Sequence, residues 1–244
     1  MQITKEIHKI LIFTMLSLFC VSTTFSQKNI KGNGNVIKQE RTVSSFDEII
    51  IKGVFNVHLA QGNEEFVMVE ADENLQPIIT VENQGNALVL GWKKGKNVRN
   101  KTKMNIYVTL KDIQKLKIEG VGSVKTASTL SLKKLKLMVS GVGNTALKLN
   151  CDTLDGNINA LGTLTLEGNV DRVTLNNSGI GYVKAFDLIA KKLELNNSGI
   201  GKVEVYADET IDITSSGIGS VRYKGNAQNK NIDSKGLGKV TKVN

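Results

Sequence analysis

The C-terminal half of the sequence repeats one pattern of hydrophobic and polar residues about every twenty positions. The plainest copies are LNNSGIGYV from Leu175, LNNSGIGKV from Leu195 and ITSSGIGSV from Ile213, and looser copies lie on both sides. The first residues of the Gly-apolar-Gly cores are Gly120, Gly141, Ala160, Gly179, Gly199, Gly217 and Gly236, at steps of 21, 19, 19, 20, 18 and 19 residues. A period near twenty is typical of a solenoid.

Within each repeat, apolar and polar residues alternate as they do in a strand. Three apolar columns are predicted to point inward: the positions four before, one after and four after the first core residue. In the copy around Gly199 these are Leu195, Ile200 and Val203. The column one after the first core residue reads Val121, Val142, Leu161, Ile180, Ile200, Ile218 and Leu237. The sequence therefore predicts an all-β protein, a right-handed parallel β-helix with coils of about 18–21 residues.

The core glycines are expected to turn a corner. Glycine permits positive φ and close backbone stacking on the next coil, and the apolar residue between the two glycines is expected to plug the core. The dinucleotide-binding motif needs a third glycine and a following helix, and both are missing here, which disfavours a nucleotide site. Two positions before the first core residue, Asn177, Asn197, Ser215 and Ser234 follow one another from repeat to repeat and predict a hydrogen-bonded polar ladder.

The repeat also predicts the organisation of the whole chain. Phe46–Leu59 matches Ile113–Thr126, so that Gly53 and Val54 correspond to Gly120 and Val121. We therefore expect a single β-helical domain over 46–244, with irregular early coils at 46–110 and regular repeats at 111–244. Residues 27–45 are interpreted as an N-terminal arm, either loose or an irregular first coil.

Residues 1–26 have the features of a secretory signal peptide. Lys5 and Lys9 precede an apolar run, Ile10–Val21, which is too short to span a bilayer, and cleavage is expected near Ser26–Gln27. Cys20 follows Phe19, where a lipoprotein signal needs a small residue, so lipidation is disfavoured. No other apolar run is long enough to cross a membrane. The protein is expected to be exported, to the periplasm or to the cell surface.

The net charge of +9 becomes +8 without residues 1–26, and most of the positive charge is lysine spread through the repeats. Such a surface favours solubility, or attraction to acidic glycans or anionic envelope lipids; export makes nucleic acid the least suitable partner. Cys151 is then the only cysteine and is expected to be buried and inert.

The sequence predicts no catalytic site, metal site or cofactor. His58 lies inside an alternating strand, and one histidine and one cysteine cannot form a metal cluster. Glu194 and Asp212 share a column on adjacent coils and could serve a glycosidase or hold a cation, but the same column holds lysine and uncharged residues, which indicates a solvated face. Lys184, Glu204 and Arg222 predict ion pairing across strands.

One loop carries a concentrated positive charge. It runs WKKGKNVRNKTK from Trp92 to Lys103, with six basic residues and no acidic one. A solvated connection is one interpretation; the other is an anion- or glycan-binding loop, with Trp92 stacking on a sugar ring. The candidate binding residues are Trp92, Lys93, Lys94, Lys96, Arg99, Lys101 and Lys103.

The lead-in FDEIIIKGVFNVHLAQGNEEFVMVEADENL, followed by repeats of SGIGxV, resembles the "putative auto-transporter adhesin, head GIN domain" family of exported bacterial proteins, over about Phe46 to Gly225. The resemblance implies a β-helical module outside the cytoplasm and supplies no catalytic motif. We therefore expect a non-enzymatic adhesion or binding module for glycan or envelope components. The alternatives are a polysaccharide lyase or glycoside hydrolase on the same scaffold, and a purely structural envelope protein.

Overall fold

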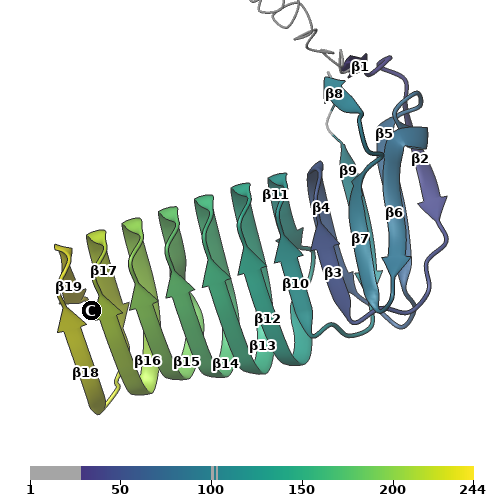
Figure 1. Cartoon of the computed structure of the whole chain (residues 1–244). Coiled ribbons are helices and arrows are strands. Elements are labelled where there is room, and N and C mark those ends of the chain that lie inside the picture. The colour runs from purple at the N-terminus through teal and green to yellow at the C-terminus, as the bar shows by residue number, and fades with distance from the viewer. Residues whose placement is uncertain (1–28, 100–101, 103) are drawn as a thin grey trace, which may run out of the picture.

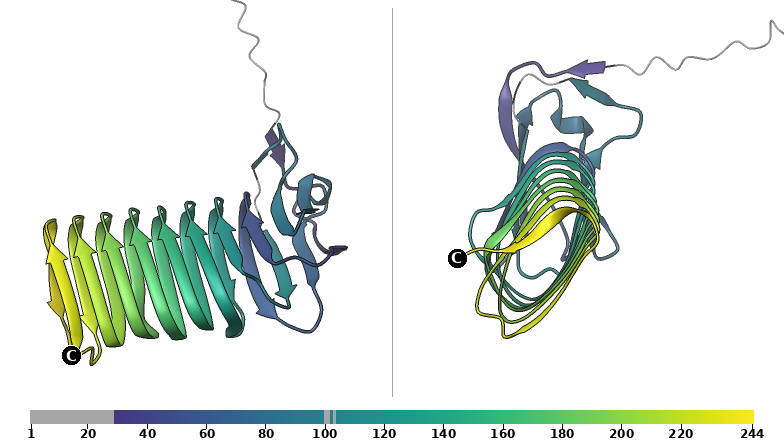
Figure 2. Two further views of the ribbon diagram at one scale, coloured as in Figure 1. Left: turned by 60° about the horizontal axis from the view of Figure 1, so that its bottom comes forward. Right: turned by 90° about the vertical axis from the view of Figure 1, so that its left-hand side faces the viewer.

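The computed structural model describes residues 29–244 except 100, 101 and 103, and it confirms the predicted fold class. A parallel β-helix extends from a smaller N-terminal region of mixed strands (Figure 1). Seen along the axis, the coils superimpose as flattened loops (Figure 2). The predicted signal peptide lies outside the described residues.

The regular coils are built from ten strands that pair in parallel with the coils before and after them. The strands are β10 (Lys115–Ile118), β11 (Val121–Thr126), β12 (Leu130–Val139), β13 (Val142–Ile158), β14 (Leu161–Asn177), β15 (Ile180–Asn197), β16 (Ile200–Ser215), β17 (Ile218–Lys224), β18 (Asn229–Ser234) and β19 (Leu237–Lys242). The longest strands run on around the bend of the coil, so that one strand contributes to both walls.

The predicted repeat register is confirmed at every core. Gly162 pairs with Gly181, Gly181 with Gly201, and the residues before them pair in the same way. Coils of unequal length are accommodated by register shifts in the stretches 165–168 and 185–192, away from the Gly-apolar-Gly corner. The corners therefore stay in line although the step between repeats varies.

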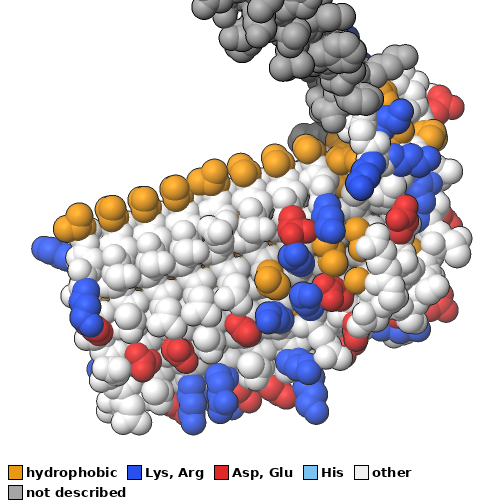
Figure 3. Space-filling view, in the orientation of Figure 1, with side chains coloured by type: hydrophobic (Ala, Val, Ile, Leu, Met, Phe, Trp, Pro, Cys, Tyr) orange, Lys and Arg blue, Asp and Glu red, His pale blue; other side chains and the backbone are white. Residues whose placement is uncertain are grey.

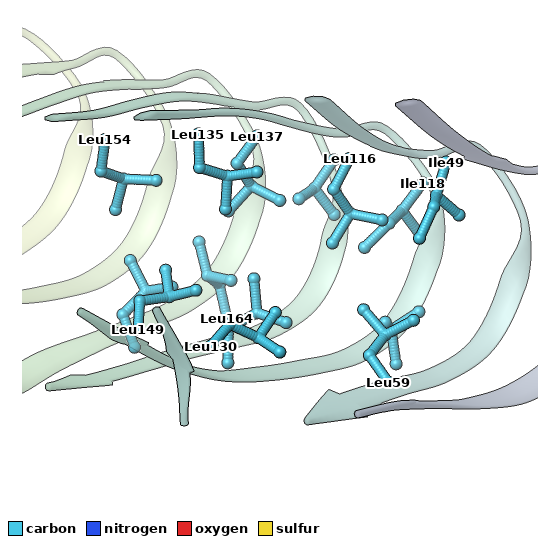
Figure 4. Close-up of a cluster of buried hydrophobic side chains, with 14 of the residues drawn as sticks. Ile49, Leu59, Leu116, Ile118, Leu130, Leu135, Leu137, Leu149, Leu154 and Leu164 are labelled. Carbon is cyan, nitrogen blue, oxygen red and sulfur yellow. The ribbon is translucent and has the colours of Figure 1, made fainter. Parts of the chain in front are cut away.

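The core lies between the two walls of each coil. Leucines from one wall, such as Leu116 and Leu137, face leucines from the other, such as Leu130 and Leu149 (Figure 4). The columns four before and four after the first core residue are buried, as predicted, except in the last coil, where Ile232 is 39% exposed. Because like residues lie over like, each coil completes the burial of its neighbours.

The predicted polar ladder is confirmed for Asn177, Asn197 and Ser215, whereas Ser234, in the last coil, is exposed and does not extend it. Asn177 Nδ2 donates to Asn197 Oδ1 at 2.7 Å, and Asn197 Nδ2 donates to Ser215 Oγ at 3.3 Å. All three side chains are buried among the coils. The first coils carry Ile118, Val139 and Ile158 in the same column, so the core changes from apolar to hydrogen-bonded along the axis.

The N-terminal region begins the solenoid and then closes its end. β3 (Glu48–Ile51) and β4 (Val54–Gln61) stack on β10 and β11, as the sequence match predicted. β7 (Ala87–Trp92) and β9 (Asn105–Leu110) continue the parallel stack on their other side. Beyond β9 the pairing turns antiparallel, through β5 (Phe66–Asp72) and then β2 (Val36–Arg41).

The remaining elements are short. β6 (Ile79–Gln84) forms an antiparallel hairpin with β7, preceded by the 3₁₀-helix η1 (Gln76–Ile78). β1 (Asn29–Lys31) pairs in parallel with β8 (Asn97–Arg99). The part of the interpreted N-terminal arm that the structure describes therefore contains two paired strands, β1 and β2.

The ladder generates a prediction with a matched control. Asn197→Ala leaves the Nδ2 of Asn177 and the hydroxyl of Ser215 without their partner inside the coil, which should lower the free energy of unfolding by about 1–3 kcal/mol. Asn196→Ala removes the same side chain from the exposed face next to it and should cost about 0.5 kcal/mol or less. Urea unfolding of both variants tests this, and equal stabilities would contradict a structural role for the ladder.

Candidate functional site

The most unusual feature of the surface is a straight row of aliphatic side chains along one edge of the solenoid (Figure 3). We call it the apolar ridge, and it consists of Val54, Val121, Val142, Leu161, Ile180, Ile200, Ile218 and Leu237. Each member pairs with the next in register. The first seven are 46–51% exposed and Leu237 is 80% exposed. A contiguous exposed apolar patch of this kind marks an interaction site more often than isolated exposed residues do.

The ridge corrects the sequence analysis. The column one after the first core residue was expected to point inward and plug the core, and this prediction is wrong. In the copy around Gly199, the buried residues are Leu195, Asn197 and Val203, whereas Ile200 points to solvent. Alternation of side chains continues through the corner. Leu195, Asn197 and Val203 are an even number of positions from Gly199 and face inward, whereas Ile200 is one position away and faces outward.

The two glycines of each core allow the corner to stack. The second one has positive φ, between 130° and 144° from Gly122 to Gly219, which disfavours any residue with a side chain. A Cβ at the first or the second glycine would also meet the backbone of the preceding coil; at Gly201 it would lie 2.0 Å from the carbonyl oxygen of Gly181. The expectation of close stacking is confirmed at both glycines, and that of positive φ at the second; the first position nevertheless accepts alanine in one coil, at Ala160.

The backbone beneath the ridge is hydrogen-bonded from coil to coil. The N–H groups of six ridge residues, Val121 to Ile218, donate to the carbonyl of the first core residue in the coil before, at 2.8–3.1 Å. Ile200, for example, donates to Gly179 at 2.9 Å. These six amide donors are therefore not left free at the surface, and entry into an apolar medium would not deprive them of hydrogen bonds to water.

The face before the ridge is flat, polar and almost without charge. In the middle coils it carries asparagine, serine or threonine, and Asn196 Nδ2 donates to Asn176 Oδ1 at 3.2 Å, in a second, exposed ladder. Next to the ridge, charge is confined to the two ends of this face, where Lys117 pairs with Glu119 and Lys235 pairs with Asp233. A shallow groove of about 480 Å³ follows this face along the coils. Figure 3 shows this mainly uncharged surface beside the ridge.

The face after the ridge carries a cluster that the sequence analysis did not recognise. We call it the aromatic–cationic patch, and it consists of Tyr182, Lys184, Phe186, Lys202, Glu204, Arg222 and Lys224. The Nζ atoms of Lys184 and Lys202 lie 4.8 and 4.9 Å from the centre of the Tyr182 ring. Lys224 Nζ lies 4.8 Å from the centre of the Phe186 ring. These separations allow cation–π attraction.

Glu204 organises the patch. Its carboxylate is paired with Lys202 at 2.7 Å and with Arg222 at 3.0 Å, and it accepts a hydrogen bond from the Tyr182 hydroxyl. Burial acts to raise the pKa of Glu204, but the hydrogen bonds from Lys202 and Tyr182 and the charge of Arg222 outweigh it, so the pKa lies below its usual value. The predicted ion pairing is confirmed for Glu204 and Arg222, whereas Lys184 stacks on Tyr182.

The structure separates the residues of the predicted binding loop. Lys93, Lys94 and Lys96 are exposed on the turn between β7 and β8. Trp92 is half-buried against Phe55, with ring centres 4.9 Å apart, so one of its faces already packs against the protein. Arg99 belongs to β8, although its side chain is not described, and Lys101 and Lys103 lie outside the described residues. Whether this loop binds a ligand stays a prediction.

The other candidates for chemistry have ordinary surroundings. Glu194 and Asp212 pair in register as expected, and each accepts a hydrogen bond from an asparagine, Asn196 and Asn231 respectively. His58 stacks on Tyr107 with ring centres 4.8 Å apart; burial and the charge of Lys125 lower its pKa. Cys151 is buried, which raises the pKa of its thiol to about 11 and makes it a poor nucleophile at neutral pH.

Within the described residues, no three side chains among His, Cys, Asp and Glu come together where they could hold a metal ion. The same part of the chain contains no helix with the length and hydrophobicity needed to cross a membrane.

The comparison with protein families decides which group this architecture represents. Residues 45–227 match the model of the family described as "Putative auto-transporter adhesin, head GIN domain". The chain belongs to this family. The match confirms the resemblance carried by the lead-in and the SGIGxV repeats, and it covers β3, β4 and the coils as far as β17. No curated protein matches the sequence.

Solved structures of similar proteins share the fold. A putative adhesin from Bacteroides fragilis is 29% identical, with a TM-score of 0.83 over 88% of this chain and 100% of that one. A protein from Parabacteroides distasonis, described as a putative lipid binding protein, is 27% identical, with a TM-score of 0.71 over 89% and 100%. A putative adhesin from Parabacteroides merdae, 22% identical with a TM-score of 0.65 over 88% and 99%, supports the fold alone.

The ridge predicts that a charge at its centre is tolerated. Ile200→Asp places the carboxylate in water and should lower the free energy of unfolding by about 1 kcal/mol. Val203→Asp, three residues later, buries an unpaired charge and should cost several kcal/mol. Urea unfolding distinguishes the two, and an Ile200→Asp variant as unstable as Val203→Asp would place the ridge inside the core.

The corner glycines generate a second prediction. Gly201→Ala combines a φ of +130° with a Cβ only 2.0 Å from a backbone oxygen, and it should cost several kcal/mol or prevent folding. Gly85→Ala also imposes positive φ, +63°, but no atom lies within 4 Å, so about 1–2 kcal/mol is expected. Circular dichroism during thermal unfolding compares them, and a Gly201→Ala protein as stable as Gly85→Ala would argue against close stacking at the corner.

Proposed function

We propose that this protein is an exported, non-enzymatic β-helical module of the periplasm or cell surface, which attaches to the envelope by binding lipid through its apolar ridge. The observation that carries the proposal is the ridge itself, eight aligned and exposed aliphatic side chains, six of which stand on backbone amides that are already bonded to the preceding coil. The family description as adhesins supports attachment, and the Parabacteroides distasonis relative described as lipid binding supports this ligand class.

The ridge is large enough to support reversible attachment. Burying a Val, Leu or Ile side chain completely is worth about 1.5–3 kcal/mol, so burying the exposed half of each ridge residue adds about 1 kcal/mol. The whole ridge then contributes roughly 8 kcal/mol before the cost of association. This is on the order of what a single acyl chain supplies, which gives weak and reversible membrane binding.

The shape of the protein places the lipid outside the coils. The space beneath the Gly-apolar-Gly corner amounts to about 30 Å³, room for one or two water molecules. An acyl chain cannot be housed there. The ridge, at about 4.8 Å per coil, is roughly 34 Å long and is suited to lie along the surface of a bilayer.

Lipid accounts for the ridge better than a glycan does. Sugar rings are bound by aromatic faces together with polar groups, whereas the ridge holds only branched aliphatic side chains. An acidic glycan bound at Lys93, Lys94 and Lys96 is the second candidate function, supported by the exposure of these three lysines on one turn. The half-buried position of Trp92 leaves less of its ring for stacking on a sugar.

The test is sedimentation of the purified protein with phospholipid vesicles. Replacing Ile180, Ile200 and Ile218 together by serine removes about 3 kcal/mol of apolar contact and should weaken vesicle binding about a hundredfold. The matched control is Asn176→Ser, Asn196→Ser, Thr214→Ser, which alters the polar face of the same three coils and should bind as the unaltered protein does.

Two outcomes would contradict the proposal. One is equal binding by the ridge variant and the control. The other is that the unaltered protein does not bind vesicles and is a dimer in analytical ultracentrifugation, while the ridge variant is a monomer. In that case a second copy of the chain covers the ridge, which would be a subunit interface.

A further inference from the structure

We infer that the aromatic–cationic patch binds the phosphate of anionic lipid headgroups while the adjacent ridge enters the apolar layer, so that this protein selects anionic membranes. The inference rests on the proposed lipid-binding function and adds to it a second contact, a headgroup class and an orientation. The proposed ligand is the phosphate of lipids in a bilayer surface, not free inorganic phosphate.

The patch lies where the headgroups would be. Tyr182 follows the ridge residue Ile180 by two positions on β15, and Lys202 follows Ile200 by two positions on β16. Only the second glycine of the corner, with its positive φ, separates the two positions, so the patch begins directly beside the ridge on the next face. With the ridge inserted and the axis parallel to the membrane, Tyr182 and Lys202 lie next to the polar boundary of the leaflet, where tyrosine and lysine are favoured. Lys184 follows Ile180 by four positions and Lys224 follows Ile218 by six, so these two ammonium groups lie farther from the ridge and face the anionic surface from the water side.

Two of the four cations of the patch are available for a ligand. Glu204 engages Lys202 and Arg222 directly. Lys184 and Lys224 contact the rings of Tyr182 and Phe186, and among the described residues neither ammonium is in an ion pair with a carboxylate. Their aromatic partners hold them at the surface without neutralising them, so each retains a full charge for an anionic headgroup.

The physics of weak membrane anchors explains why two contacts would be combined. One acyl-chain equivalent gives only marginal attachment, and stable attachment takes a second signal such as a group of basic residues. Because the charge of the patch is screened by salt and the apolar contact is not, the two contributions can be separated by ionic strength.

The experiment compares binding to vesicles of phosphatidylcholine with binding to vesicles of phosphatidylcholine and phosphatidylglycerol at about three to one. The unaltered protein should prefer the anionic vesicles at low salt and lose the preference as salt rises. Lys184→Gln with Lys224→Gln should weaken anionic binding about 25-fold, at about fivefold for each lysine, and leave binding to phosphatidylcholine unchanged.

Two controls separate this site from net charge and from the basic loop. Lys133→Gln with Lys134→Gln removes the same charge from exposed positions at the bend opposite the ridge and should keep the preference nearly intact. Lys93→Ser, Lys94→Ser, Lys96→Ser tests the loop, several coils away at the N-terminal end. Inorganic phosphate at millimolar concentration should not compete with the vesicles, because it offers nothing to the ridge.

The outcomes distinguish the inference from the function on which it rests. Binding to both kinds of vesicle with equal affinity, or an equal loss in the patch and opposite-bend variants, would overturn the headgroup site and leave ridge-mediated lipid binding in place. If only the loop variant lost the preference for anionic vesicles, the anion site would be at Lys93, Lys94 and Lys96, and the proposed role of the patch would be wrong. Absence of binding to either vesicle would overturn both proposals.

Discussion

The close contact of backbone with backbone at the Gly-apolar-Gly corners is the constraint on which the rest of the structure depends. Each corner lies directly over the one before, because at the core glycines the carbonyl oxygens of one coil occupy the space where a Cβ of the next would be; Ala160 is the one first core residue from 120 to 236 that carries a Cβ. Differences in coil length are therefore absorbed in the stretches 165–168 and 185–192. With the corners fixed, the inward columns fall into line, and the core and the Asn177–Asn197–Ser215 ladder follow from that alignment.

The same constraint aligns the ridge residues from coil to coil, but it does not require them to be aliphatic. In most coils the residues directly before and after the ridge residue are glycines, so the ridge side chain is covered mainly by the ridge residues of the coils on either side. A polar residue at Ile200 would be compatible with the fold at a cost of only about 1 kcal/mol, because the amide is already bonded to Gly179 and about half of the side chain is exposed to solvent. The fold therefore does not require Val, Leu or Ile at these positions, and their presence on coil after coil points to a requirement from outside the molecule.

Periodicity alone predicted the fold, the register of the coils and the polar ladder, because a repeat in the sequence becomes a column in a solenoid. The sequence analysis wrongly predicted an inward direction for the ridge residues because seven aliphatic residues in one column resemble a core column. The alternation of inward and outward positions along the strand indicates the opposite direction. Counting by two from Leu195 through Asn197 leads to Val203 and leaves Ile200 outside. The patch could not be predicted, because Phe186 and Lys224 are brought together across an irregular stretch of the coil. Nor did the sequence reveal that Trp92 packs on Phe55.

The two faces that meet at the ridge differ in charge. The face before it has uncharged amides and hydroxyls bonded to one another, which lowers the cost of bringing it near a headgroup layer without giving it a preference for charge. The face after it concentrates cations around aromatic rings in the C-terminal coils. A surface that is apolar at its edge, neutral on one side and positive on the other would approach a membrane in one orientation only. Selectivity for anionic lipid and orientation on the membrane would then have the same physical origin, the asymmetry of charge about the ridge.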